Sequence, residues 1–303
     1  MKFNVTSEKY FIIFLYLSLI FLAIGLFRSD YVNIELERLN YFYLMLSFLF
    51  LFTGFLLNCV SWYITCLELN HRISLSEAIS SQGLTVFGKY IPGKVWIIFG
   101  RAAYFAKLGF SLNTLIQLSL YTQLLSIWVG LGLGIVGLIF ISSLVHYLWI
   151  IILLWAVCGI LLFSPLHKIG CITKVMKKLS RNDEPFVWMK FSTAISKIPA
   201  FLLFWLSWTA GFFFLLEALF PRIRCSMLTS LAFPFAATLG IVALMCPGGL
   251  GVREGLLVLY LFHSGMSMEN STLASIASRI WFTIGEVFLF LVGIVLNMNH
   301  KNT

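Results

Sequence analysis

Long apolar runs alternate with short polar segments along most of the chain. A helix needs about 20 apolar residues to cross a hydrocarbon core of about 30 Å. The first run lacks the small-x-small cleavage site that ends a signal peptide, so we expect it to be a retained helix. We predict six membrane-spanning helices, at about Tyr10–Phe27, Tyr41–Thr65, Leu112–Ile141, Tyr147–Phe163, Ile198–Phe220 and Leu273–Asn297.

Shorter apolar stretches flank two Pro-Gly breaks. The first break, at Pro92-Gly93, separates Ile73–Phe87 from Val95–Leu108, and the second, at Pro247-Gly248, separates Met227–Cys246 from Leu256–Phe262. Apart from Met227–Cys246, which Pro234 is expected to break, these pieces are too short to cross a membrane alone, so we predict two re-entrant helical hairpins. A helix that starts after each break presents free N–H groups there, and these attract anions.

The distribution of basic residues predicts the orientation. The loop 168–190 contains six Lys or Arg residues against Asp183 and Glu184, which is typical of a cytoplasmic loop. Counting spans from this loop places both termini in the cytoplasm and Asn33 and Ser267 outside. The first hairpin then opens from the cytoplasm and the second from the outside. Arg222 and Arg224 are exceptions, because they fall on the outside.

Three spans and one hairpin in each half, with opposite orientations, form an inverted repeat. Such repeats are common in transporters, where interrupted helices at matching positions mark the binding site. Aligning the two Pro-Gly breaks brings Gly109-Phe110-Ser111 beside Gly265-Met266-Ser267, with a one-residue slip. The predicted fold is an all-α integral membrane protein, a single polytopic domain over residues 1–303 with halves at about 1–142 and 146–303.

Composition agrees with this class. The chain is 60% hydrophobic and 11% charged, whereas soluble proteins average about 25% charged residues. Its net charge of +9 is explained by cytoplasmic loops, so we expect no nucleic-acid partner. Six scattered cysteines without a C-x-x-C pair, and histidines without ligand spacing, predict neither a metal site nor a cofactor. Asp30 and Asp183, the two aspartates, fall in predicted loops and cannot build a metal-dependent glycosyltransferase site.

Two glycine patterns have structural interpretations. Gly88-x-x-x-x-Gly93-Lys94 matches the start of a nucleotide-binding P-loop, but Val95 stands where Ser or Thr would bind magnesium and no strand precedes it. No ATPase is implied. The segment Leu112–Ile141 contains a G-x-x-x-G pair among its glycines, which predicts close packing against another helix.

Ionisable residues in apolar segments are the candidates for function. Each costs about 2.5–3.5 kcal/mol at mid-membrane, so these residues must face one another or a wet cavity. The alternative is a network of ion pairs that only orients helices, with Arg279 and Glu286 pairing with Glu254 and Arg253. The five are Arg101, Arg253, Glu254, Arg279 and Glu286.

The three arginines of this set, together with Lys89 and Lys94 beside the first break, outnumber the two carboxylates. Together with two helix N-termini they suit an anion such as phosphate, which Arg grips bidentately and Lys binds as a point charge. We predict no catalytic residue and no metal ligand. The predicted substrate-binding residues are Lys89, Tyr90, Pro92, Gly93, Lys94, Arg101, Pro247, Gly248, Gly249, Arg253, Glu254, Arg279 and Glu286.

These motifs resemble a known family. Lys89-Tyr90-x-Pro92-Gly93-Lys94-x-Trp96, Gly100-Arg101, Pro247-Gly248-Gly249-x-Gly251-x-Arg253-Glu254 and Arg279…Gly285-Glu286 are similar to the lysylphosphatidylglycerol synthase transmembrane region family, also called flippase-like domain proteins. The resemblance extends over roughly Tyr10 to Asn297. It implies a module that moves aminoacylated lipid between leaflets, whereas a separate soluble domain performs the aminoacyl transfer. The chain lacks that domain, so lysyl transfer is not expected.

The sequence therefore favours a transporter over an enzyme. The leading hypothesis is a flippase-like lipid translocase of the cell membrane that moves an anionic phospholipid or a polyprenyl-phosphate-linked glycolipid between leaflets. Stand-alone members of the family are associated with cell-envelope glycolipid pathways. One alternative is a membrane-embedded transferase acting on a lipid phosphate, with Glu254 or Glu286 as base. Another is a non-catalytic scaffold that binds envelope-biosynthesis proteins.

Overall fold

The computed structural model describes residues 39–67, 73–90, 96–106, 111–141, 143, 145–163, 191–223, 225–243 and 251–302. The predictions for Tyr10–Phe27, for the loop 168–190 and for the tips of the two hairpins, including Pro92, Gly93, Lys94, Pro247, Gly248 and Gly249, lie outside these residues. The described α-helices are α2 (Tyr41–Cys66), α3 (Leu75–Thr85), α4 (Trp96–Ala106), α5 (Leu112–Leu138), α6 (Val145–Phe163), α8 (Phe191–Leu219), α9 (Ala232–Val242), α10 (Val252–His263) and α11 (Met268–Asn302), with 3₁₀ helices η4 (Val86–Tyr90) and η7 (Thr229–Leu231).

The predicted class, an all-helical multi-pass membrane protein, is confirmed. Four helices are long and apolar enough to cross a membrane, and the described part of the chain contains no strand. The 19-residue helix α6 is also apolar and exposes Trp149 and Leu153 among many large hydrophobic side chains. Six spans and a re-entrant course for the hairpins stay predictions. The four long spans are Tyr41–Cys66, Thr114–Leu138, Phe191–Leu219 and Met268–Asn299.

Several predicted boundaries differ from the structure; α11, for example, begins at Met268 and not at Leu273. The helix expected to begin at Ile198 begins at Phe191, and it includes Pro199. Hydropathy missed these first two turns because they contain Lys197, which is nevertheless buried and donates a hydrogen bond from Nζ to the Ile64 carbonyl oxygen at 3.1 Å. Pro234 was expected to break its apolar segment. It lies instead in the first turn of α9, where the N–H that Pro lacks has no intrahelical partner to lose.

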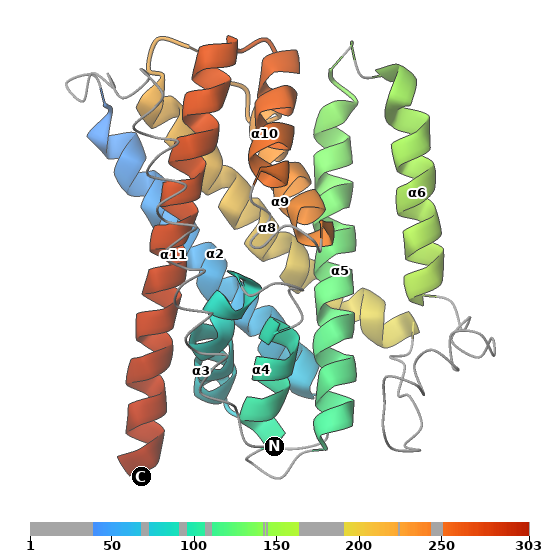
Figure 1. The fold of residues 1–303 in the computed structure, drawn as a ribbon, viewed down its shortest axis with the longest axis vertical. Coiled ribbons are helices and arrows are strands. Elements are labelled where there is room, and N and C mark those ends of the chain that lie inside the picture. The colour runs from blue at the N-terminus through green and yellow to red at the C-terminus, as the bar shows by residue number, and fades with distance from the viewer. Residues whose placement is uncertain are drawn as a thin grey trace.

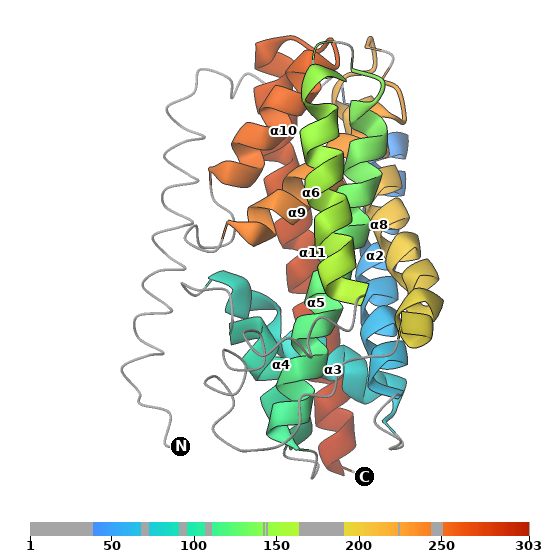
Figure 2. The same ribbon diagram turned by 90° about the vertical axis from the view of Figure 1, so that its right-hand side faces the viewer.

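The short helices pack against the long helices α5 and α11. In Figure 1, α5 and α11 run nearly the full height of the molecule, and α2 and α8 cross it obliquely. The pair α3 and α4 occupies the lower half and the pair α9 and α10 the upper half, and the quarter-turn view shows the same separation (Figure 2). Helix α2 packs along α8, α3 along α11, and α9 and α4 against α5. Each half of the molecule therefore carries one pair of short helices.

Glycines set the closest helix contacts. The G-x-x-x-G pair of α5 faces α9: a Cβ on Gly134 would lie 2.5 Å from Phe235 Cβ, and one on Gly130 would lie 2.6 Å from Thr238 Cγ2. The predicted packing role of this pair is confirmed. A second contact joins α3 to α11, where a Cβ on Gly83 would lie 2.5 Å from the Leu289 carbonyl oxygen and 2.9 Å from Gly293 Cα. At both contacts only hydrogen atoms fit between the helices.

Candidate functional site

One face of α11 carries the residues around which the site is built. Arg279, Phe282 and Glu286 are spaced by three and four positions, so they lie on the same side of the helix. Arg279 and Glu286 are buried, with exposed fractions of 6% and 1%. The same face begins with buried serines, including Ser275, and ends at Gly293 against α3. This face is therefore buried against the rest of the protein over most of the length of α11.

An ion pair joins the end of the first pair of short helices to α11. Lys89 lies in η4, directly after α3, and its Nζ donates to Glu286 Oε1. The ammonium group also lies 5.1 Å from the centroid of the Phe282 ring, within the range of a cation–π interaction. The contact between Gly83 and α11 positions η4 for this pair. The segment formed by α3 and η4 is thus fixed to α11 by shape and by charge.

Arg253 brings the second pair of short helices to the same place. It is the second residue of α10, and its guanidinium carbon lies 5.0 Å from the centroids of both Phe233 of α9 and Phe282. Gly240 makes room for it, because a Cβ there would lie 2.9 Å from Arg253 Cβ. Phe282 therefore interacts with Lys89 from the lower half and with Arg253 from the upper half.

Glu254 links the start of α10 to α11. Its Oε2 accepts a hydrogen bond from the Gly251 backbone N–H at 2.8 Å, and its Oε1 pairs with Arg279 Nη1 at 3.3 Å. Gly251 adopts φ of 81°, a conformation that favours glycine. Ser275 Oγ donates to the Glu254 carbonyl oxygen at 3.2 Å. The N-terminus of α10, predicted to attract an external anion, already holds this carboxylate of the chain.

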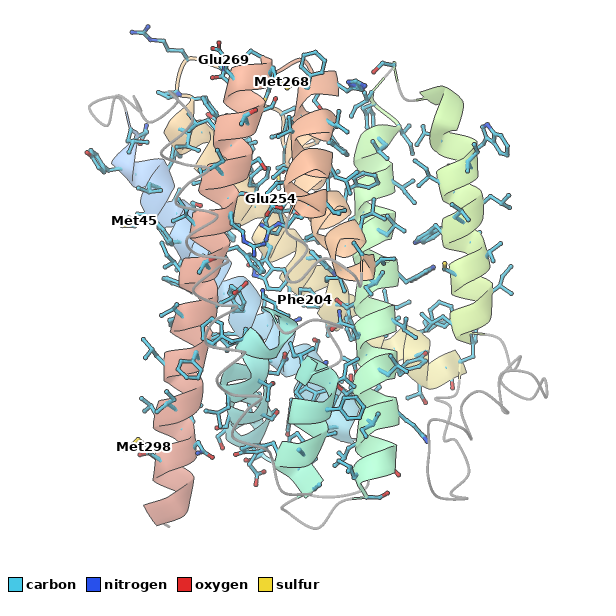
Figure 3. The ribbon with its side chains drawn as sticks, in the orientation of Figure 1. Met45, Phe204, Glu254, Met268, Glu269 and Met298 are labelled. Atoms are coloured by element: carbon cyan, nitrogen blue, oxygen red, sulfur yellow. The ribbon has the colours of Figure 1, made fainter. Side chains whose placement is uncertain are left out.

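The group formed by Lys89, Arg253, Glu254, Arg279 and Glu286, which we call the central charge group, carries three cations and two carboxylates. At neutral pH its formal charge is +1, and Phe233 and Phe282 screen part of it from water. Figure 3 shows Glu254 in the upper half of the molecule, between α10 and α11 and below their upper ends. Such a group can bind an anion, because one further negative charge would neutralise its formal charge of +1.

Arg101 lies apart from the central charge group. It is 3% exposed in α4, and its guanidinium carbon lies 4.8 Å from the centroid of the Trp62 ring in α2. Among the described residues it has no ion pair or hydrogen bond with any member of the group. The structure thus joins Lys89 and four of the five predicted mid-membrane charges, and it places the fifth elsewhere. The ion pair of Arg279 with Glu254 agrees with the alternative hypothesis, in which a network of ion pairs only orients the helices.

The side chains of several predicted site residues lie outside the described part of the structure. Tyr90 ends η4, but its side chain lies outside the described residues, as do both Pro-Gly breaks. Conversely, sequence reasoning missed Phe282, Phe233 and Trp62, the aromatic partners of the cations. Phe282 carried a signal, because it lies between Arg279 and Glu286 on one helix face. Nothing in the sequence marked Phe233 or Trp62 among so many aromatic residues.

No group of three His, Cys, Asp or Glu side chains in the described part of the chain could hold a metal ion. The buried charges enclosed by apolar helices define an integral membrane protein with a polar centre. A comparison with protein families matches residues 10–293 to the lysylphosphatidylglycerol synthase TM region. The chain belongs to this family and is a membrane lipid-related protein. A comparison with curated proteins found no match.

Proposed function

We propose that the protein is a lipid translocase that moves an anionic phospholipid or a polyprenyl-phosphate-linked glycolipid between membrane leaflets. The observation that carries the proposal is the central charge group, which lies between two pairs of short helices in a family of membrane lipid-related proteins. Buried ionisable groups in membrane proteins usually mark substrate pathways. A lipid headgroup is the substrate whose chemistry matches both the charge and the surrounding bilayer.

The chemistry of the group favours a phosphate. Arg253 and Arg279 can each bind two phosphate oxygens, and a hydrogen bond to a charged group contributes about 1.5–3 kcal/mol. The rings of Phe233 and Phe282 exclude water from Arg253, which strengthens its attraction for an anion. A phosphate that binds Arg279 competes with Glu254, the residue that caps α10. Headgroup binding therefore competes with the ion pair that holds this cap.

The two pairs of short helices supply the path in this proposal. We take α3 with α4, and α9 with α10, as re-entrant hairpins related by an inverted repeat, which open to opposite sides of the membrane. Both hairpins contact the central charge group, through Lys89 and Arg253. The headgroup would pass between them while the acyl chains stay in the bilayer. The loop 168–190 and both termini lie in the cytoplasm in this arrangement.

The transferase and scaffold alternatives are less well supported. A general base needs a carboxylate that can take a proton from the substrate. Glu254 holds a backbone N–H and Arg279, and Glu286 holds Lys89, so both are bound to donors. A scaffold would depend on its surface charges more than on Arg253. Removing the basic residues of the loop 168–190 should therefore impair a scaffold but leave translocation intact.

The test is lipid movement by the purified chain in liposomes that contain fluorescent phosphatidylglycerol, with dithionite quenching of the outer leaflet. Arg253→Ala should abolish the movement, and Arg253→Lys should recover little of it, because Lys lacks the bidentate fork. Gly240→Ala keeps every charge but displaces Arg253, so it should also slow the movement. Arg222→Ala, at an exposed position, is the control and should behave as the wild type.

Two outcomes would contradict the proposal. Arg253→Ala protein that moves lipid at the wild-type rate would rule out the headgroup site. Loss of folded, monodisperse protein in both Arg253 variants would instead assign the residue to the ion-pair network that orients helices.

A further inference from the structure

Arg101 is a buried cation whose hydrogen-bonding capacity is largely unused. Its side chain is 3% exposed, and its Nε and Nη2 atoms are buried without a hydrogen-bond partner. Within the described part of the chain, no carboxylate forms an ion pair with it. A guanidinium stays charged at any physiological pH, and a buried unpaired charge is strongly unfavourable. The structure therefore leaves one cation without the partner that its burial requires.

The two unused atoms define the shape of the missing partner. Nε–H and Nη2–H point in parallel from one edge of the guanidinium, and together they form the fork that binds two oxygens of one phosphate or carboxylate. Trp62 covers the flat face of the group by a cation–π contact, which leaves that edge free. The nearby side chains of α2 include Cys59 and Cys66, which carry no formal charge as thiols.

We infer that Arg101 is a second oxyanion site, distinct from the central charge group, that binds a phosphate group side-on through Nε and Nη2. Helix α4 lies in the lower half of the molecule, whereas α10 with Arg253 lies in the upper half (Figures 1 and 2). A second buried cation, Lys197 of α8, lies close to Cys66 and so adds positive charge near this part of α2. The ligand class is a phosphate ester or free phosphate. The site does not depend on lipid translocation.

Binding by the purified full-length chain tests the inference. Calorimetric titrations would use dihexanoyl phosphatidylglycerol, a soluble phosphodiester lipid, and separately inorganic phosphate. Arg101→Gln should remove one class of sites, and Arg101→Lys should weaken that class at least about tenfold because it loses a charged hydrogen bond. Arg222→Gln should bind as the wild type, and Arg253→Gln should keep the Arg101 class while losing any class at the central charge group. Failure of the proposed function would thus be distinguished from failure of this inference.

The titrations also identify the source of the oxyanion. Binding of the short-chain lipid alone assigns the site to a headgroup, and binding of inorganic phosphate with equal affinity assigns it to a soluble anion. Either result supports the oxyanion site. Wild-type protein that binds neither probe, or Arg101→Gln protein that binds both as the wild type does, would overturn it.

Thermal stability gives an independent measurement. Arg101→Met removes the unpaired charge and keeps a long side chain, so this variant should be at least as stable as the ligand-free wild type. The bound probe should raise the Tm of the wild type but not that of Arg101→Met. An equal ligand-dependent shift in both proteins would refute the inference. So would Arg101→Met protein that cannot fold, because Arg101 would then be a structural residue.

Discussion

The ion pair between Lys89 and Glu286 allows the sharpest test of how η4 is held against α11. Glu286→Gln removes a negative charge at a position that is 1% exposed, and it leaves Lys89, which is 26% exposed, beside Phe282 without its counter-ion. Removing one partner of a buried pair costs about 3–5 kcal/mol. Because Lys89 is partly exposed to solvent, we expect the lower end of this range, a decrease of about 3 kcal/mol in the free energy of unfolding.

The assay is the apparent Tm, measured by size-exclusion chromatography of detergent-purified protein after heating. A change of 1 kcal/mol shifts Tm by about 2–4 °C in domains of 150–250 residues, and by less in larger ones. Glu286→Gln should therefore lower Tm by about 6 °C. Glu269→Gln, at an exposed position near the start of the same helix, is the matched control and should leave Tm unchanged.

The double variant Lys89→Met with Glu286→Met replaces both charges by apolar groups of similar length. It should recover most of the lost stability, because no unpaired charge remains. A Tm of Glu286→Gln within about 1 °C of the wild type would refute the reasoning, since the pair would then hold nothing in place. If the double variant is stable but moves no lipid, the pair belongs to the headgroup path; if it moves lipid normally, the pair only positions η4.

Three further predictions concern packing, topology and reactivity. Gly83→Ala should cost about 1–3 kcal/mol because its Cβ meets the backbone of α11, whereas Gly255→Ala, where a Cβ meets nothing within 4 Å, should not destabilise; equal Tm values for the two would contradict the packing. In a chain with its own cysteines replaced, Lys174→Cys should react with a membrane-impermeant maleimide only from the cytoplasmic side and Ser267→Cys only from outside, and the reverse pattern would overturn the topology. Burial, with the charge of Glu217, raises the pKa of the Cys225 thiol to about 11, so its labelling rate should keep rising from pH 8 to pH 10, and a plateau near pH 9 would show an ordinary thiol.

Local patterns predicted most of the fold. The apolar run Tyr41–Thr65 became α2 within one residue of its expected end, because hydropathy and helix length act on the same stretch of chain. Both pairs of short helices were expected from the Pro-Gly breaks, because Pro followed directly by Gly strongly disfavours the continuation of a helix. The start of α8 was missed because hydropathy scores Lys197 as polar. Its burial depends on a carbonyl oxygen of α2, more than a hundred residues away in the chain.

The members of the site were predictable, but their partners were not. Charges in apolar segments identified Arg253, Glu254 and Arg279, because the cost of exposing them to lipid holds for any fold. That Lys89 would pair with Glu286, and that Arg101 would lie on Trp62 far from α10, depends on how the short helices approach the long helices. Periodicity fixes the face of a helix on which a residue lies. It does not fix which residue of another helix meets that face.

The two interactions of Glu254 connect the first turn of α10 to Arg279 of α11. Its carboxylate caps the backbone at Gly251 with one oxygen and holds Arg279 with the other. An anion that draws Arg279 away frees the carboxylate to move, and the first turn of α10 then loses the group that fixes its entry. Arg253, in that same turn, would shift with it. In the proposed translocase, an anion bound at Arg279 would thus change the position of Arg253 as well.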